Sequence, residues 1–71
     1  MEISAEELKE LWERDPEHLA NALASVLQDF GYTSCTKQYV KVEIQRLYDG
    51  GSPQGGPSMF LAEWIEGGIS Q

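Results

Sequence analysis

The sequence predicts an all-α fold, a small four-helix domain arranged as a short orthogonal bundle over residues 1–71. Apolar residues recur three and four positions apart in four segments, as in helices with one buried face. Capping residues, glycine and proline bound these segments. No two segments alternate as a convincing pair of strands would. We therefore expect helices over roughly residues 4–14, 16–30, 36–48 and 58–66.

The start of the first helix is indicated by Ser4 and Glu7, which have the spacing of a capping box. In that motif each side chain accepts a hydrogen bond from a backbone N–H that would otherwise lack a partner. Leu8, Leu11 and Trp12 then lie on one helical face, and acidic residues occupy the other. This segment is predicted to be an amphipathic helix that packs through its leucines and tryptophan.

The second helix has start and stop signals of its own. Asp15 and Pro16 suit the N-cap and the first helical position, because the carboxylate accepts backbone N–H bonds and proline has a helical φ. Gly31 suits a left-handed C′ position, which would place Leu27 and Tyr32 at the contact positions of a Schellman cap. The apolar residues of this central core helix are Leu19, Leu23, Val26, Leu27 and Phe30.

The third segment fits two interpretations. Residues 40–45 alternate apolar and polar side chains like a half-buried strand. Helical spacing also places Val40, Ile44, Leu47 and Tyr48 on one face and leaves Val42 as the apolar outlier. A lone strand would leave its backbone groups unpaired, so we predict a helix capped near Ser34 or Thr36. The strand remains an alternative if two chains pair through it.

Residues 49–57 contain four of the seven glycines and two of the three prolines, which excludes a regular element there. Glycine-rich loops can bind phosphate, but this one has no preceding strand and no Gly-Lys-Ser/Thr ending. We expect a flexible connecting loop within the domain.

Pro57 or Ser58 is expected to open the last helix, and Gly67 and Gly68 to close it. Its apolar arc is wider than a small surface helix needs, so part of it fills the core or docks a partner. The residues of this arc are Met59, Phe60, Leu61, Trp64 and Ile65.

The chain has many large apolar side chains for its length. The expected core residues are Leu8, Leu11, Trp12, Leu19, Leu23, Val26, Leu27, Phe30, Val40, Ile44, Leu47, Phe60, Leu61, Trp64 and Ile65. Burying all of them at once exceeds what four short helices readily do. We therefore expect a non-catalytic protein–protein interaction module or a homo-oligomer that uses the C-terminal helix. The candidate partner-binding residues are Trp12, Met59, Phe60 and Trp64, with core and interface both open for Phe60 and Trp64.

The net charge of −7 argues against nucleic acid as a partner, because binding to phosphates requires clustered Lys and Arg. Residues 16–48 nevertheless resemble a helix-turn-helix superficially, with three of the five basic residues on the candidate recognition helix. The alternative function is a nucleic-acid-associated regulator whose contacts would be Lys37, Lys41 and Arg46. Seven acidic and two basic residues within residues 1–17 could attract a basic partner, although a solvated helix face is the favoured interpretation.

No motif for catalysis, metal or cofactor is recognisable, so we expect neither an enzyme nor a cofactor. His18 and Cys35 are the single histidine and cysteine, and no spacing pairs them. The chain is similar to acyl carrier proteins in length and acidity, but it has Asp15-Pro16-Glu17 in place of that family's Asp-Ser-Leu. No apolar run approaches the length of a membrane span, and we expect a cytoplasmic protein.

Overall fold

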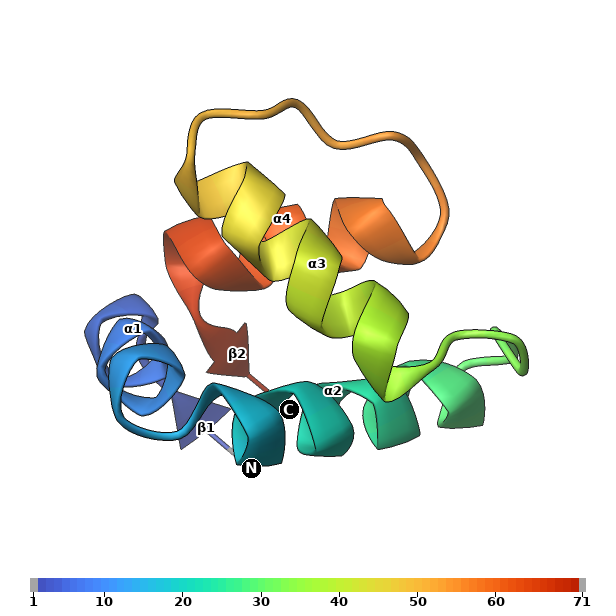
Figure 1. The fold of residues 1–71 in the computed structure, drawn as a ribbon, viewed down its shortest axis with the longest axis horizontal. Helices are drawn as coiled ribbons and strands as arrows, with labels where there is room; N and C mark the ends of the chain where they lie inside the picture. The colour runs from blue at the N-terminus through green and yellow to red at the C-terminus, as the bar shows by residue number, and fades with distance from the viewer. Residues whose placement is uncertain (1, 71) are drawn as a thin grey trace.

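The computed structural model describes residues 2–70, which form four helices and one short strand pair (Figure 1). The elements are β1 (Glu2–Ile3), α1 (Ala5–Arg14), α2 (Pro16–Asp29), α3 (Lys37–Tyr48), α4 (Pro57–Gly67) and β2 (Ile69–Ser70). The predicted all-α four-helix fold is confirmed, and each helix boundary lies within one residue of its expected position. Among residues 2–70, no helix combines the length and apolarity that a bilayer span requires.

Local capping explains where these helices begin. Ser4 and Glu7 form the predicted capping box at the start of α1, with the Glu7 N–H donating to Ser4 Oγ over 3.1 Å. Asp15 accepts a hydrogen bond from the His18 N–H at the start of α2. Thr36 accepts one from the Tyr39 N–H at the start of α3. Three side-chain caps therefore fix three helix starts.

The end of α2 is the predicted Schellman cap. The Gly31 N–H donates to the Gln28 carbonyl over 3.0 Å, and the Tyr32 N–H donates to the Leu27 carbonyl over 3.1 Å. Gly31 adopts a φ of +110°, a conformation that side-chain-bearing residues rarely adopt. The turn sends the chain out of α2 and toward α3.

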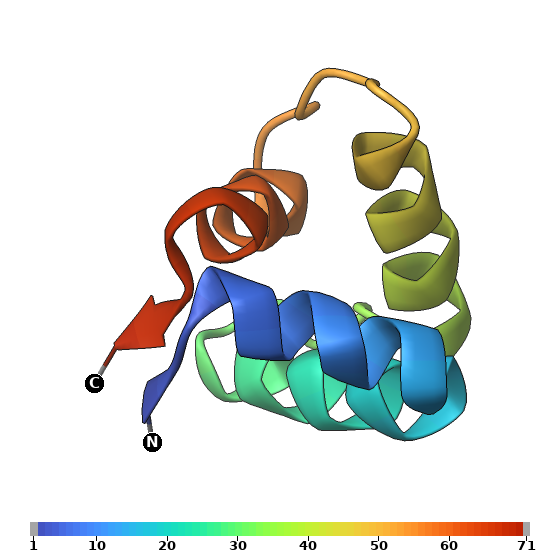
Figure 2. The ribbon, with the colours of Figure 1, turned by 90° about the vertical axis from the view of Figure 1, so that its left-hand side faces the viewer.

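The four helices contact one another in a closed ring rather than along a common axis (Figures 1 and 2). The most extensive contact is between α2 and α3, and the others join α1 to α2, α3 to α4, and α4 back to α1. Figure 1 shows α3 crossing over α2, with the loop after α3 arching over the molecule to α4. Each helix thus covers part of one shared core.

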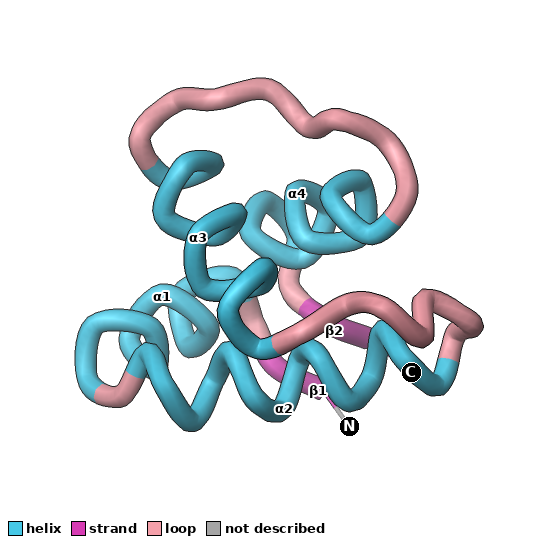
Figure 3. Tube along the Cα trace, turned by 45° about the vertical axis from the view of Figure 1, so that its right-hand side comes forward, coloured by secondary structure: helices cyan, strands magenta, loops and turns pink. Residues whose placement is uncertain are grey.

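The short antiparallel pair of β1 and β2 was not expected from the sequence. Glu2 pairs with Ser70 and Ile3 pairs with Ile69, which brings two segments from opposite ends of the chain together (Figure 3). Gly68 precedes β2 with a φ of +81°, and this conformation turns the chain from α4 into the pair. The pair joins the start of α1 to the end of α4.

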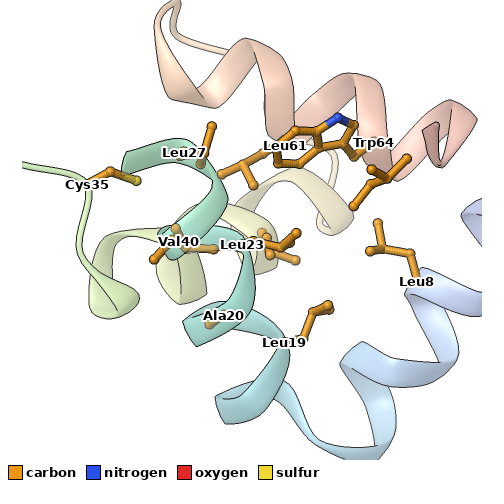
Figure 4. Packing of buried hydrophobic residues seen from close by; sticks show 12 residues of the cluster. Leu8, Leu19, Ala20, Leu23, Leu27, Cys35, Val40, Leu61 and Trp64 are labelled. Atoms are coloured by element: carbon orange, nitrogen blue, oxygen red, sulfur yellow. The ribbon is translucent and has the colours of Figure 1, made fainter. Parts of the chain in front are cut away.

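The core draws on all four helices, the segment before α3 and β2 (Figure 4). Its residues are Leu8, Leu19, Ala20, Leu23, Ala24, Leu27, Cys35, Val40, Ile44, Leu61, Trp64 and Ile69. Trp64 is 8% exposed and therefore belongs to the core. The expected core residues that are missing from this cluster, except Phe30, are partly buried and pack against it. The expectation for Phe30 was wrong, since this residue is 48% exposed. Phe30 is the C-cap residue of α2, one position past the last helical residue, Asp29.

The helical interpretation of residues 40–45 is confirmed, since they lie within α3. Val40 and Ile44 are buried, and Val42 is 57% exposed, as the helical spacing predicts for an outlier.

The loop between α3 and α4 is anchored at several points, although the sequence predicted a flexible connector. The Gly51 N–H donates to the Arg46 carbonyl over 2.9 Å, and Arg46 Nη2 donates to the Ser52 carbonyl over 2.6 Å. Farther along, the Gln54 N–H donates to Ser58 Oγ over 3.1 Å. These bonds tie the loop to both helices that it connects.

Candidate protein-binding surface

Four aromatic rings gather where the end of α2 meets α4. The Phe60 ring centroid lies 5.3 Å from Phe30, 6.0 Å from Tyr32 and 6.0 Å from Trp64. The Phe30 and Trp64 centroids are 6.4 Å apart. These separations are those of favourable tilted and edge-on aromatic pairs. The cluster runs from the buried Trp64 outward to the exposed Phe30.

Phe30 and Phe60 of this cluster, together with Met59, which directly precedes Phe60 on α4, are defined here as the apolar patch. Phe30 is 48% exposed and Met59 is 47% exposed, whereas Phe60 is half-buried between Phe30, Tyr32 and Trp64. Phe60 is partly exposed and also packs against Trp64 of the core. Two of the predicted partner-binding residues, Met59 and Phe60, are consecutive on α4, and Phe30, which was expected in the core, packs against Phe60.

The charged residues nearest to the apolar patch along α2 and α4 are acidic. Asp29 directly precedes Phe30, and Glu63 lies one turn after Met59 on α4, followed by Glu66 one turn later. All three side chains are exposed. Within residues 2–70, none of them takes part in an ion pair. Neither α2 nor α4 contains a lysine or an arginine.

Trp12, the remaining predicted partner-binding residue, lies apart from the apolar patch. Its ring packs against Tyr48, with centroids 6.3 Å apart, and it is half-buried. Trp12 lines a shallow groove of about 440 Å³ with Pro16 at the start of α2 and several side chains of α3. The α3 residues of this groove are Gln38, Lys41, Val42 and Gln45. The structure therefore divides the predicted binding residues between two places.

The cations proposed for nucleic-acid contact are all engaged in ion pairs. Lys37 and Lys41 on α3 both pair with Glu17 at the start of α2, and the Lys37 Nζ to Glu17 Oε1 distance is 2.8 Å. These hydrogen bonds lower the pKa of Glu17 to about 2. Phosphate would have to compete with this carboxylate for both lysines.

The third cation, Arg46, forms an ion pair with the buried carboxylate of Glu43. Its Nε and Nη2 donate to the two oxygens of Glu43 over 2.9 and 2.6 Å. Ser58 of α4 donates to the same carboxylate from a fully buried position. Arg46 lowers the pKa of Glu43, and the Ser58 hydroxyl acts in the same direction. The burial of Glu43 was not predicted from the sequence, because it depends on contact with Ser58, which is fifteen positions away on α4.

The single cysteine and the single histidine lie in different environments. Cys35 is buried, and desolvation raises the pKa of its thiol, which disfavours the nucleophilic thiolate. His18 is exposed in the first turn of α2. Within residues 2–70, no group of three His, Cys, Asp or Glu side chains is placed to hold a metal ion.

Comparison of the chain with protein families, with characterised proteins and with solved structures gives no match. The surface itself is therefore the basis for a functional proposal.

Proposed function

We propose that this protein is a non-catalytic protein-interaction module that binds a partner through the apolar patch of Phe30, Met59 and Phe60. The observation that carries this proposal is the exposure of Phe30 and Met59 next to Phe60, on a domain whose core is already filled by other residues. Large aromatic side chains supply most of the binding energy in protein interfaces. Methionine adds an adaptable contact, because its side chain is flexible and polarizable.

Position on the fold also supports this surface. Phe60 is held by three aromatic neighbours, so its ring is ordered before a partner arrives. Phe30 follows the last turn of α2, which its Schellman cap holds in place. Anchors that are already ordered lose less conformational entropy on binding than mobile side chains do.

The test is selection of binding peptides from a random library displayed on phage, followed by affinity measurements with two variants. The double variant Phe30→Ser/Met59→Ser removes the exposed apolar groups of the patch. Val42→Ser is the matched control, since Val42 on α3 is an apolar residue whose exposed fraction of 57% is somewhat larger than those of Phe30 and Met59. We expect selected peptides to bind the patch variant at least about tenfold more weakly and the control variant with unchanged affinity.

Circular dichroism of both variants shows whether they remain folded, and we expect each to lose no more than about 1 kcal/mol of stability. Peptides that bind the folded patch variant as tightly as the wild type would contradict the proposal. Loss of binding in Val42→Ser alone would move the binding surface to the Trp12 groove.

A further inference from the structure

We infer that the partner of the apolar patch is a basic segment, in which apolar side chains are flanked by lysine or arginine, and that the patch does not pair with a second copy of this chain. This inference rests on the proposed function and specifies the chemistry of the partner. It follows from the charges that frame the patch.

Three exposed carboxylates lie on the segments that carry the apolar patch. Asp29 directly precedes Phe30, Glu63 lies one helical turn from both Met59 and Phe60, and Glu66 follows one turn farther along α4. Within the described part of the chain, the ion pairs use the carboxylates of Glu17 and Glu43 and leave these three without a cation. The two helices that carry the patch have no Lys or Arg of their own. A partner that brings cations would therefore pair with carboxylates that the fold leaves available.

A symmetric dimer through this patch would be opposed by the same charges. In a two-fold interface the patch of one copy faces the patch of the other, so both sets of carboxylates would approach each other. Like charges placed opposite one another in an interface disfavour that pairing. The net charge of −7 adds long-range repulsion between copies. The same field attracts a basic partner and raises its rate of association.

The experiment uses three synthetic helical peptides that share the same leucine and tryptophan positions. Their remaining positions are lysine in the first peptide, glutamine in the second and glutamate in the third. Binding is measured by titration of the isotope-labelled protein in NMR, so that shifted amides locate the contact. Each titration is made at about 0.01 M and about 0.15 M salt, between which the Debye length falls from about 30 Å to about 8 Å.

Two charge variants provide the matched control. Asp29→Asn/Glu63→Gln removes carboxylates beside the patch, and Glu6→Gln/Glu10→Gln removes two exposed carboxylates from α1. Both variants change the net charge from −7 to −5, so a difference between them reports position rather than total charge.

We expect the lysine peptide to bind most tightly, to shift amides around Phe30 and Phe60, and to weaken as salt is raised. We also expect Asp29→Asn/Glu63→Gln to weaken this binding about five- to tenfold, and the α1 variant to change it by less than about twofold.

Two results would overturn the inference while leaving the interaction module intact. The first is equal binding of the glutamine and lysine peptides at both salt concentrations, lost in Phe30→Ser/Met59→Ser. The second is a concentration-dependent dimer in light scattering that the same variant abolishes. If no peptide bound in a manner sensitive to Phe30→Ser/Met59→Ser, the proposed function would fail as well.

Discussion

At the scale of single residues, the buried carboxylate of Glu43 links α3 to α4. It is 5% exposed, and it accepts hydrogen bonds from Arg46 on α3 and from Ser58 on α4. Arg46 in turn donates to the Ser52 carbonyl in the connecting loop. A buried charge is costly unless it is paired and hydrogen-bonded, so this carboxylate favours the one arrangement that supplies all its partners.

Replacement of Glu43 by alanine is expected to lower the free energy of unfolding by about 3 kcal/mol at neutral pH. This value is the lower end for breaking a buried ion pair, because Arg46 is one-third exposed and can reach solvent. The measurement is urea denaturation, with Glu10→Ala on the exposed face of α1 as the control, which should change stability by less than about 0.5 kcal/mol.

Comparison of the wild type with Glu43→Ala at lower pH tests whether the lost stability comes from the charge of the carboxylate. The pKa of Glu43 in the folded chain lies below its ordinary value of 4.5, so its stabilising contribution is complete above that value. As pH falls through the lowered pKa, the carboxylate is protonated and the contribution is lost. The difference between wild type and Glu43→Ala should therefore narrow in acid. A difference that stays constant down to about pH 2.5 would show that lost packing, not lost charge, destabilises the variant.

At the scale of elements, local signals predicted the helices well because they lie within a few residues of one another. The Ser4 capping box, the Asp15-Pro16 start and the Gly31 cap each act inside one turn of helix. The β1–β2 pair escaped prediction because its partners are at opposite ends of the chain and each strand has only two residues. A two-residue segment carries no periodicity from which a strand could be inferred.

The candidate site was predictable only in part, because the exposure of its residues depends on contacts between segments that are distant in the sequence. The width of the apolar arc on the last helix indicated Met59 and Phe60, but exposure depends on which neighbours cover a residue. Phe30 fits the apolar stripe of α2 by its spacing, yet it follows the last residue of that helix and is 48% exposed. Trp64 shares a helical face with Phe60 and is nevertheless buried. Spacing places a side chain on a face, and tertiary packing decides how much of it remains exposed.

The junction between α4 and β2 provides a test at this scale, with two adjacent glycines as variant and control. A Cβ on Gly68 would collide with the Ile3 carbonyl oxygen and lie 3.0 Å from the Ala5 nitrogen, and φ is +81°. We expect Gly68→Ala to destabilise the chain by about 2–3 kcal/mol, since strain and collision add. Gly67→Ala meets nothing within 4 Å and should be neutral or stabilising by up to about 0.5 kcal/mol.

Thermal unfolding of both glycine variants distinguishes the two positions. Similar unfolding temperatures for Gly67→Ala and Gly68→Ala would show that the close approach of β1 to the end of α4 contributes little to stability.

At the scale of the whole molecule, the ring of helix contacts makes every helix part of the same core. Leu8 of α1, Leu27 of α2, Ile44 of α3 and Leu61 of α4 are each almost fully buried. The radius of gyration of 10.8 Å reflects this shared packing. A chain of this size buries a modest share of its surface and has a small free energy of unfolding. The loss of one side of the core should therefore destabilise the whole domain.

Truncation after Gly55 tests whether α4 is part of the folding unit or an appendage that serves only to bind. It removes Leu61 and Trp64 from the core and Ile69 from the strand pair, and it leaves Ser58 unavailable to Glu43. We expect the remaining chain to lose its cooperative thermal transition in far-ultraviolet circular dichroism, because three helices cannot enclose the residues that α4 covers.

Addition of residues 56–71 as a separate peptide provides the control for this truncation. We expect the peptide to restore a cooperative transition in a concentration-dependent manner, since association would then rebuild the shared core. A Leu61→Ser peptide should fail to do so, because Leu61 is 1% exposed in the intact chain. A cooperative transition in the truncated chain alone would contradict the prediction that α4 is part of the folding unit. It would show that α1–α3 form a core of their own, and that the whole apolar arc of α4 is available to a partner.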